Sequence, residues 1–346
     1  MGFKKILKLI RRVFLITLTI ILVKLLIPLP RYQTSQSNNQ IQGVWMTHIG
    51  TSFLSYVTLL DNAFHQLSRL NFNRVYVDVY NGGVIYPSQY APRNYKRSLP
   101  FTDPLKAAIE AGKSQNLKIY AWYEHGMMMF PDDKLAKEHP DWLLATADGQ
   151  TFIEKHVWLD PNNPEVAEYF TNLFLEVANN YPDLYGIQLD DHWGIPQVFG
   201  NKVDAMNQLT QKVFSAIKKT RPDLIISLSP NPYNFAYNKY SQDWLAWVKQ
   251  RLVDEVVVQV YRPTTQQVTD SLINAGLNTA QQYVPVAVGI YTGDLYTKKS
   301  LTEIKNQISV VENSNYGYAL FCWEYLFTPL KRGSLAEKEA IFIEQS

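Results

Sequence analysis

The feature of this 346-residue sequence that most restricts its fold is an eightfold alternation of short apolar runs and longer amphipathic stretches. The β-branched and aromatic runs occupy 43–49, 74–80, 118–123, 185–190, 224–229, 255–261, 284–290 and 318–323. Stretches with helical spacing of apolar residues lie at 53–70, 103–115, 164–180, 202–219, 241–251, 266–280, 300–313 and 335–344. Strands that alternate with helices predict right-handed βαβ units and a parallel sheet. Eight such units predict an α/β fold of the closed (β/α)8 TIM-barrel type.

A doubly wound open sheet is the alternative to a barrel. Such a sheet more often carries a glycine-rich phosphate loop after its first strand, and the sequence GVWMTHIGTSF has none. The longest connection, 124–163, follows the third strand. We expect it to form a small excursion over the barrel mouth, with Asp148-Gly149 at a hairpin turn.

The N-terminal segment differs from the body in charge and hydropathy. Residues 1–31 hold seven basic residues and no acidic one, and 13–23 form an uncharged apolar run. A basic stretch followed by an apolar one is typical of an export signal. Because no small-residue cleavage site follows, we expect an uncleaved signal anchor over 1–31, with a cleaved signal peptide as the alternative. A polar linker is then expected over 32–42 and the barrel domain over 43–346.

Charge and cysteine content exclude several classes of protein. The 26 basic and 31 acidic residues outside the N-terminal segment give positions 32–346 a formal charge of −5. An acidic body argues against nucleic acid as a partner. Cys322 is the only cysteine, so intramolecular disulfides and clustered thiolate metal sites are excluded.

Polar side chains that end the predicted strands indicate where chemistry occurs, because the carboxyl ends of the strands hold the site in this fold. Most are carboxylates, amides and aromatic rings, which suit a sugar with its hydroxyl groups and apolar faces. Asp190 and Asp191 end the fourth strand, and alternation along 186–190 places Gln188 and Asp190 in the barrel lumen.

Glycoside hydrolysis requires two carboxyl groups in different protonation states. We expect Asp190 to be the general acid or nucleophile, with Asp191 or Glu324 as its catalytic partner. Glu124 could also oppose Asp190. We nevertheless expect Glu124 to bind substrate together with other polar and aromatic residues at the strand ends. The expected substrate-binding residues are Asp78, Tyr80, Trp122, Glu124, Gln188, His192, Asn231, Gln259 and Tyr261. The structural alternative is that one of the two aspartates, Asp190 or Asp191, caps the segment that follows it or pairs with His192.

Neither a metal nor another cofactor is expected. His125 and His192 could join Asp190 in a metal site, but no HxH or HExxH spacing supports one.

Several segments together resemble the glycosyl hydrolase-like family 10, over about 43–325. They are GVWMTHIG, LNFNRVYVDVYNGG, WLDPNNPEVAEYFTNLFLEVANNY, YGIQLDDH and VVVQVYRP. The resemblance implies a TIM-barrel glycosidase of the cell envelope that cuts peptidoglycan glycan strands, particularly strands stripped of stem peptides. The positions that match are Asp160, Asp190, Asp191, Gln259 and Tyr261. Two positions depart from the pattern of this family. His192 stands where relatives usually have an aromatic residue after the second aspartate, and the family pattern gives no catalytic role to Glu324.

The sequence therefore predicts an envelope glycoside hydrolase, anchored in the lipid bilayer with its barrel on the extracytoplasmic side, or secreted if the signal is cleaved. Its expected partner is a polysaccharide. Two alternatives remain open at this point: a non-catalytic glycan-binding barrel, and a hydrolase of an exopolysaccharide.

Overall fold

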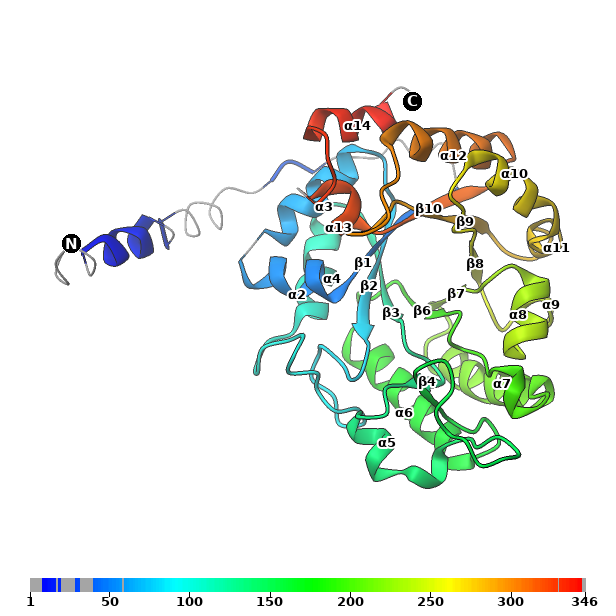
Figure 1. Ribbon diagram of the computed structural model, residues 1–346. Coiled ribbons are helices and arrows are strands. Elements are labelled where there is room, and N and C mark those ends of the chain that lie inside the picture. Colours follow the sequence, from blue (N-terminus) through cyan, green and yellow to red (C-terminus); the bar gives the residue numbers. More distant parts are fainter. Residues whose placement is uncertain are drawn as a thin grey trace.

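The centre of the molecule is a closed barrel of eight parallel strands, as the sequence predicts (Figure 1). The computed structural model describes residues 8–16, 18–19, 29–31, 40–57, 59–328 and 330–343. The strands follow one another around the barrel in the order β1-β10-β9-β8-β7-β6-β3-β2. Their bounds are β1 Gln42–Met46, β2 Arg74–Tyr80, β3 Lys118–Tyr123, β6 Gly186–Asp190, β7 Ile225–Ser229, β8 Glu255–Gln259, β9 Val286–Tyr291 and β10 Gly317–Phe321.

Helices surround the barrel (Figure 1). They are α2 His48–Tyr56, α3 Leu60–Arg69, α4 Pro104–Ser114, α6 Pro164–Asn180, α7 Val203–Thr220, α8 Tyr233–Tyr240, α9 Trp244–Lys249, α10 Thr265–Asn274, α11 Leu277–Ala280, α12 Leu301–Asn313, α13 Trp323–Phe327 and α14 Leu335–Ile343. Two stretches predicted as single helices, 53–70 and 266–280, are each divided into two. The second divides at Gly276, whose φ of 88° lies in the left-handed region that ends a helix.

Alternation along the strands sorts side chains between the lumen and the outer core. In β6, Ile187 and Leu189 join the main apolar cluster that packs under the helices. Gln188 and Asp190 face the lumen, as the sequence predicts. A separate cluster inside the barrel contains Trp45, Tyr76, Tyr120 and Trp122, among others. Gly186 makes room for it, since a Cβ there would lie 2.6 Å from the Tyr120 ring.

A buried ion pair closes the lower end of the lumen. The guanidinium of Arg74, at the start of β2, contacts the carboxylate of Glu255, at the start of β8. The hydroxyl groups of Tyr76 and Tyr120 donate to the same carboxylate at 3.1 and 2.9 Å. With its charge paired and its oxygens bonded, this layer is a packed floor below the site.

The excursion after β3 forms a small sheet of its own. Its strands β4 Met128–Met129 and β5 Val157–Trp158 pair antiparallel. The chain between them contains the short helices α5 Lys134–Glu138 and η1 Pro140–Trp142. The expected turn is present, because the Gly149 amide donates to the Thr146 carbonyl at 2.9 Å. This turn lies between β4 and β5 in the sequence, but other segments separate it from both strands, so it does not join them directly.

Much of the expected signal anchor falls outside the described residues, as does most of the polar linker. Residues 8–16 are helical with exposed side chains. Within the ranges that the structure covers, no helix combines the length and the apolar character needed to cross a membrane. The expected boundaries of these segments stay predictions.

Candidate active site

The carboxyl end of β6 holds the central acid of the site. Asp190 has an exposed fraction of 6%, and both of its carboxylate oxygens accept hydrogen bonds. Oδ2 accepts from Trp122 Nε1 at 3.0 Å, and Oδ1 accepts from the Asp191 amide at 2.9 Å. Oδ1 also accepts from Nε2 of Gln259, at the end of β8. Three N–H donors on one carboxylate fix its orientation and favour its charged form.

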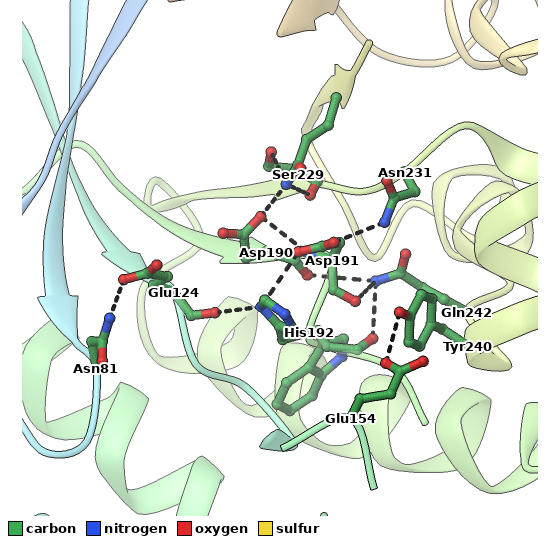
Figure 2. A network of polar contacts seen from close by, with 12 residues as sticks. Asn81, Glu124, Glu154, Asp190, Asp191, His192, Ser229, Asn231, Tyr240 and Gln242 are labelled. Atoms are coloured by element: carbon green, nitrogen blue, oxygen red, sulfur yellow. Dashed lines mark hydrogen bonds and ion pairs between the residues drawn. The ribbon is translucent and has the colours of Figure 1, made fainter. Parts of the chain in front are cut away.

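The next two residues are held by neighbouring strand ends (Figure 2). Asp191 Oδ2 accepts from Asn231 Nδ2 at 2.7 Å, and Asn231 follows β7. Nδ1 of His192 lies 3.2 Å from the carbonyl of Glu124 and 3.4 Å from Asp191 Oδ1. Three side chains predicted from strand ends are therefore brought together.

Gln242, which lies between α8 and α9, fixes the loop that carries these residues. Its Nε2 lies 3.3 Å from the Asp191 carbonyl and 3.0 Å from the Trp193 carbonyl. Sequence reasoning missed Gln242, because it falls inside the stretch predicted as a helix over 241–251. Only the tertiary fold brings that segment against the end of β6.

A second carboxyl group, that of Glu124, belongs to the same group of polar side chains as Asp190 (Figure 2). Glu124 directly follows β3, and its Oε2 accepts from Nδ2 of Asn81, which follows β2. Asp78 is 1% exposed, and its charge acts on Glu124. Asp78 Oδ2 is 3.3 Å from His48 Nδ1 and 3.8 Å from Arg97 Nη1. Arg97 belongs to a loop with no helical or strand pattern, so the sequence did not indicate it.

The two acids are electrostatically coupled. Burial raises the pKa of Glu124 to about 8, and the negative charge of Asp78 adds to this shift. Burial also raises the pKa of Asp190 well above its usual value, and the charges of Asp191 and Glu124 contribute. Because each negative charge disfavours the other, the pair is more stable with one carboxyl group protonated than with both ionised.

Tyr261 borders the same site. It lies two residues after β8 and is partly exposed, and its ring packs 5.5 Å from that of Phe321. Burial raises the pKa of its phenol well above the usual value, and the charges of Asp190 and Asp191 are the next causes. Tyr261 and Gln259 thus both lie near Asp190, where the sequence places them.

Glu324 is the main correction to the predicted catalytic set. Its Oε1 accepts from the amide and hydroxyl of Thr47 and from the amide of Gly50, each at 2.9 Å. Thr47 is the N-cap of α2, so Glu324 stabilises the start of that helix. The carboxyl groups whose charges raise the pKa of Asp190 are those of Asp191 and Glu124.

The expected sugar-binding role of Tyr80 is also wrong. We expected it on the lumen side with Asp78, but the register between β2 and β3 shifts between these two residues. Tyr80 therefore turns outward into the core, where its hydroxyl lies 3.1 Å from that of Tyr169 on α6.

Two other predicted sugar contacts are positioning residues. Gln188 is fully buried, with Oε1 accepting from Trp45 Nε1 at 2.7 Å and Nε2 donating to Ser227 Oγ at 3.0 Å. Trp122 is 1% exposed and donates to Asp190. The polar side-chain atoms of Gln188 and Trp122 are already hydrogen-bonded to protein groups below the surface of the site. This corrects the prediction that these two residues bind substrate.

One group of potential metal ligands occurs among the residues described. Ligand atoms of Asp190, Asp191 and His192 lie within 4.8 Å of one another, and His125 is not part of this group. The N–H donors that surround Asp190 compete with a cation for its lone pairs, so the arrangement suits a hydrogen-bonded carboxylate better.

Acidic side chains at the carboxyl ends of barrel strands define a TIM-barrel protein with a carboxylate-centred site. The chain belongs to the family described as Glycosyl hydrolase-like 10, whose model matches residues 40–208 and 201–311. It is similar to the protein named Glycosyl hydrolase DigH from Escherichia coli strain K12. The two are 23% identical over 308 residues, which cover 68% of each chain.

Solved structures support the fold. A Bacteroides thetaiotaomicron protein assigned as an alpha-L-fucosidase aligns with a TM-score of 0.58 and 13% identity, over 91% of this chain and 98% of that chain. The alpha-galactosidase TtGalA from Thermus thermophilus, in complex with stachyose, aligns with a TM-score of 0.56 and 16% identity. That alignment covers 90% of this chain and 66% of the galactosidase. At these identities the similarity shows the barrel architecture.

Proposed function

We propose that this protein hydrolyses glycosidic bonds, with Glu124 and Asp190 as the reacting carboxyl groups. The observation that carries the proposal is the contrast between their environments. Asp190 accepts from three N–H donors, whereas Glu124 accepts from one described amide and is next to the carboxylate of Asp78. Pairs of carboxyl groups in unlike environments supply the acid and the base of glycosidases.

The geometry suggests a role for each group. Glu124, with a pKa of about 8, holds a proton at neutral pH and donates it to the leaving oxygen of the glycosidic bond. Asp190 is oriented by its donors and acts as the carboxylate that attacks the anomeric carbon or activates water. Asp191, held by Asn231, stays within reach of sugar hydroxyls or of the water.

Peptidoglycan glycan strands are the substrate we propose. The sequence resemblance implies this polymer, and family membership supports a glycan as the general class. The basic and apolar N-terminal segment fits an enzyme that works outside the cytoplasmic membrane. We place the barrel on the extracytoplasmic side, held near the wall by residues 1–31.

The direct test is release of reducing ends from purified, peptide-free glycan strands. Asp190→Asn keeps the size of the side chain and removes its ionisable oxygen, so we expect a rate at least about 100-fold lower. Asp183→Asn is the matched control. Asp183 is exposed before β6, at the opposite end of the barrel, where it pairs with Lys113 at 2.8 Å.

Two results would contradict the proposal. If the folded Asp190→Asn protein cuts as fast as the Asp183→Asn protein, Asp190 is not catalytic. If the wild-type protein binds strands saturably but releases no reducing ends, the chain is a glycan-binding barrel and the hydrolase proposal fails.

A further inference from the structure

A pocket of about 530 Å³ opens beside the candidate active site. It is lined by the segment that follows β8, including Tyr261 and Arg262, and by the segment 297–300 between β9 and α12. Tyr261 connects the two places, because it lines this pocket and lies two residues after Gln259, whose side-chain amide donates to Asp190. A ligand in the pocket would therefore be continuous with one at the carboxylates.

Three cations line this pocket: Arg262, Lys298 and Lys299. The Arg262 guanidinium makes only neutral contacts, donating from Nε to Ser271 Oγ at 3.0 Å and from Nη1 to the Tyr261 carbonyl at 3.3 Å. Among the described residues, no carboxylate forms an ion pair with any of the three. The Nη2 atom of Arg262 makes no hydrogen bond within that part of the chain.

Lys299 adds charge at the back of the pocket. It is 7% exposed, and its ammonium donates to the Arg262 carbonyl at 2.8 Å, the Tyr291 carbonyl at 2.9 Å and Gln307 Oε1 at 2.7 Å. Its three protons are therefore bonded to neutral acceptors. Its charge is therefore not neutralised by a direct ion contact, and it adds to the charges of Arg262 and Lys298 at this pocket.

One acid, Glu303, also lines the pocket, and its negative charge offsets part of the charge of Lys299. Its Oε1 accepts hydrogen bonds from neutral groups, Thr265 Oγ1 at 2.7 Å and Gln307 Nε2 at 3.0 Å. Asp294 accepts from the Tyr291 hydroxyl and from the Tyr296 amide. Because positions 32–346 carry a formal charge of −5, a pocket with more cations than acids is a local exception.

We propose that this pocket binds a carboxylate carried by a sugar of the substrate glycan. The Arg262 guanidinium and the exposed Lys298 ammonium contact the carboxylate, and the Tyr261 and Tyr291 rings pack against the sugar face. Guanidinium and ammonium groups form the strongest hydrogen bonds with such anions. This inference rests on the proposed function, because it makes the pocket a subsite of the same cleft.

Sugar carboxylates come from two sources: a carboxyethyl ether, as in peptide-free wall glycan, and a uronic acid. The experiment uses oligomers of wall glycan and of galacturonic acid, each in native form and with its carboxyl groups chemically reduced to alcohols. Binding to the Asp190→Asn protein is measured by calorimetry at low and high salt. We expect about tenfold tighter binding of the native form of the true ligand, with the difference reduced at high salt.

Substitutions test whether the preference for the native oligomer over the reduced one depends on this pocket. Lys298→Gln and Arg262→Gln should each lower the ratio of native to reduced binding by about three- to tenfold. Lys219→Gln, on the exposed last turn of α7, is the matched control and should leave the ratio unchanged. The oligomer that shows the preference identifies the source of the carboxylate.

Failure of this inference is distinguishable from failure of the proposed function. If native and reduced oligomers bind equally and wild-type protein still cuts wall glycan, the carboxylate subsite is wrong and the hydrolase stands. If the preference exists but the Lys298 and Arg262 variants retain it, the anion binds elsewhere and this pocket is excluded. If no oligomer is bound or cut, both proposals fall.

Discussion

At the scale of single residues, the proposed chemistry depends on how hydrogen-bond donors are distributed between two acids. Asp190 receives N–H groups from Trp122, Gln259 and its own neighbour Asp191. Glu124 is paired with Asn81 and lies against the negative charge of Asp78. The donors of Asp190 oppose the burial that raises its pKa, whereas Glu124 has one described donor and a like charge beside it. We therefore assign the negative charge of the pair to Asp190 and the proton to Glu124.

The pH dependence of kcat/KM follows from the raised pKa of Glu124. A proton donor is active only below its pKa, so the rate should fall as the pH rises through about 8, the value to which burial and Asp78 raise Glu124. Glu124→Gln should lower the rate about 100-fold or more and remove this alkaline limb. A pH–rate profile of wild type and variant checks both effects.

A matched variant separates this role from general damage to the site. Glu337→Gln changes an exposed carboxylate in the first turn of α14 and should leave the profile unchanged. If the alkaline limb persists in Glu124→Gln, another group is the proton donor.

At the scale of elements, strand alternation explains most of the site, and breaks in alternation explain the errors. Asp190, Gln259 and Asn231 could be placed from the sequence because each lies at or just beyond a regular strand end. Tyr80 could not, because a register shift between β2 and β3 reverses its side. The structural role of Glu324 depends on α2, whose start at His48 the sequence did not predict. Arg97 reaches the site from a loop that carries no periodic signal, and Gln242 reaches it from a segment that the helical pattern assigned to a helix over 241–251.

The lowest layer of the barrel provides a test of stability. Replacing Glu255 by Gln leaves the Arg74 guanidinium buried without its counter-charge. Breaking a buried pair in this way costs about 3–5 kcal/mol of unfolding free energy. Urea unfolding followed by circular dichroism measures the difference.

A double variant refines that test. Arg74→Met combined with Glu255→Gln removes the stranded charge, so it should be less destabilised than the sum of the two single variants. A cost for Glu255→Gln below about 1 kcal/mol, as for an exposed pair, would show that this layer is hydrated.

At the scale of the whole molecule, the eightfold alternation is sufficient to predict a closed barrel, since each strand–helix unit adds one parallel neighbour. Sequence alone does not determine how the long excursion after β3 folds. Its two paired strands have only two residues each, which is too short to show the alternation of apolar and polar residues that predicts a strand. The sequence also leaves the fit of a particular sugar undetermined, because loops shape the subsites.

The N-terminal segment gives a prediction about location. If residues 1–31 are an uncleaved anchor, the full chain should sediment with membranes and be released by detergent but not by alkaline carbonate. A chain beginning at residue 32 behind a cleavable export signal should be recovered in the soluble extracytoplasmic fraction. Cleavage of the native segment would be detected as a shortened N-terminus by mass spectrometry and would contradict the anchor.

The most direct test of the central claim is glycan cleavage in water enriched with oxygen-18, followed by mass spectrometry of the products. Hydrolysis through Glu124 and Asp190 predicts one heavy oxygen at each new reducing end with the wild-type protein, and uncut strands with Asp190→Asn. Strands left intact by the wild-type protein, or products that contain no heavy oxygen, would contradict the account.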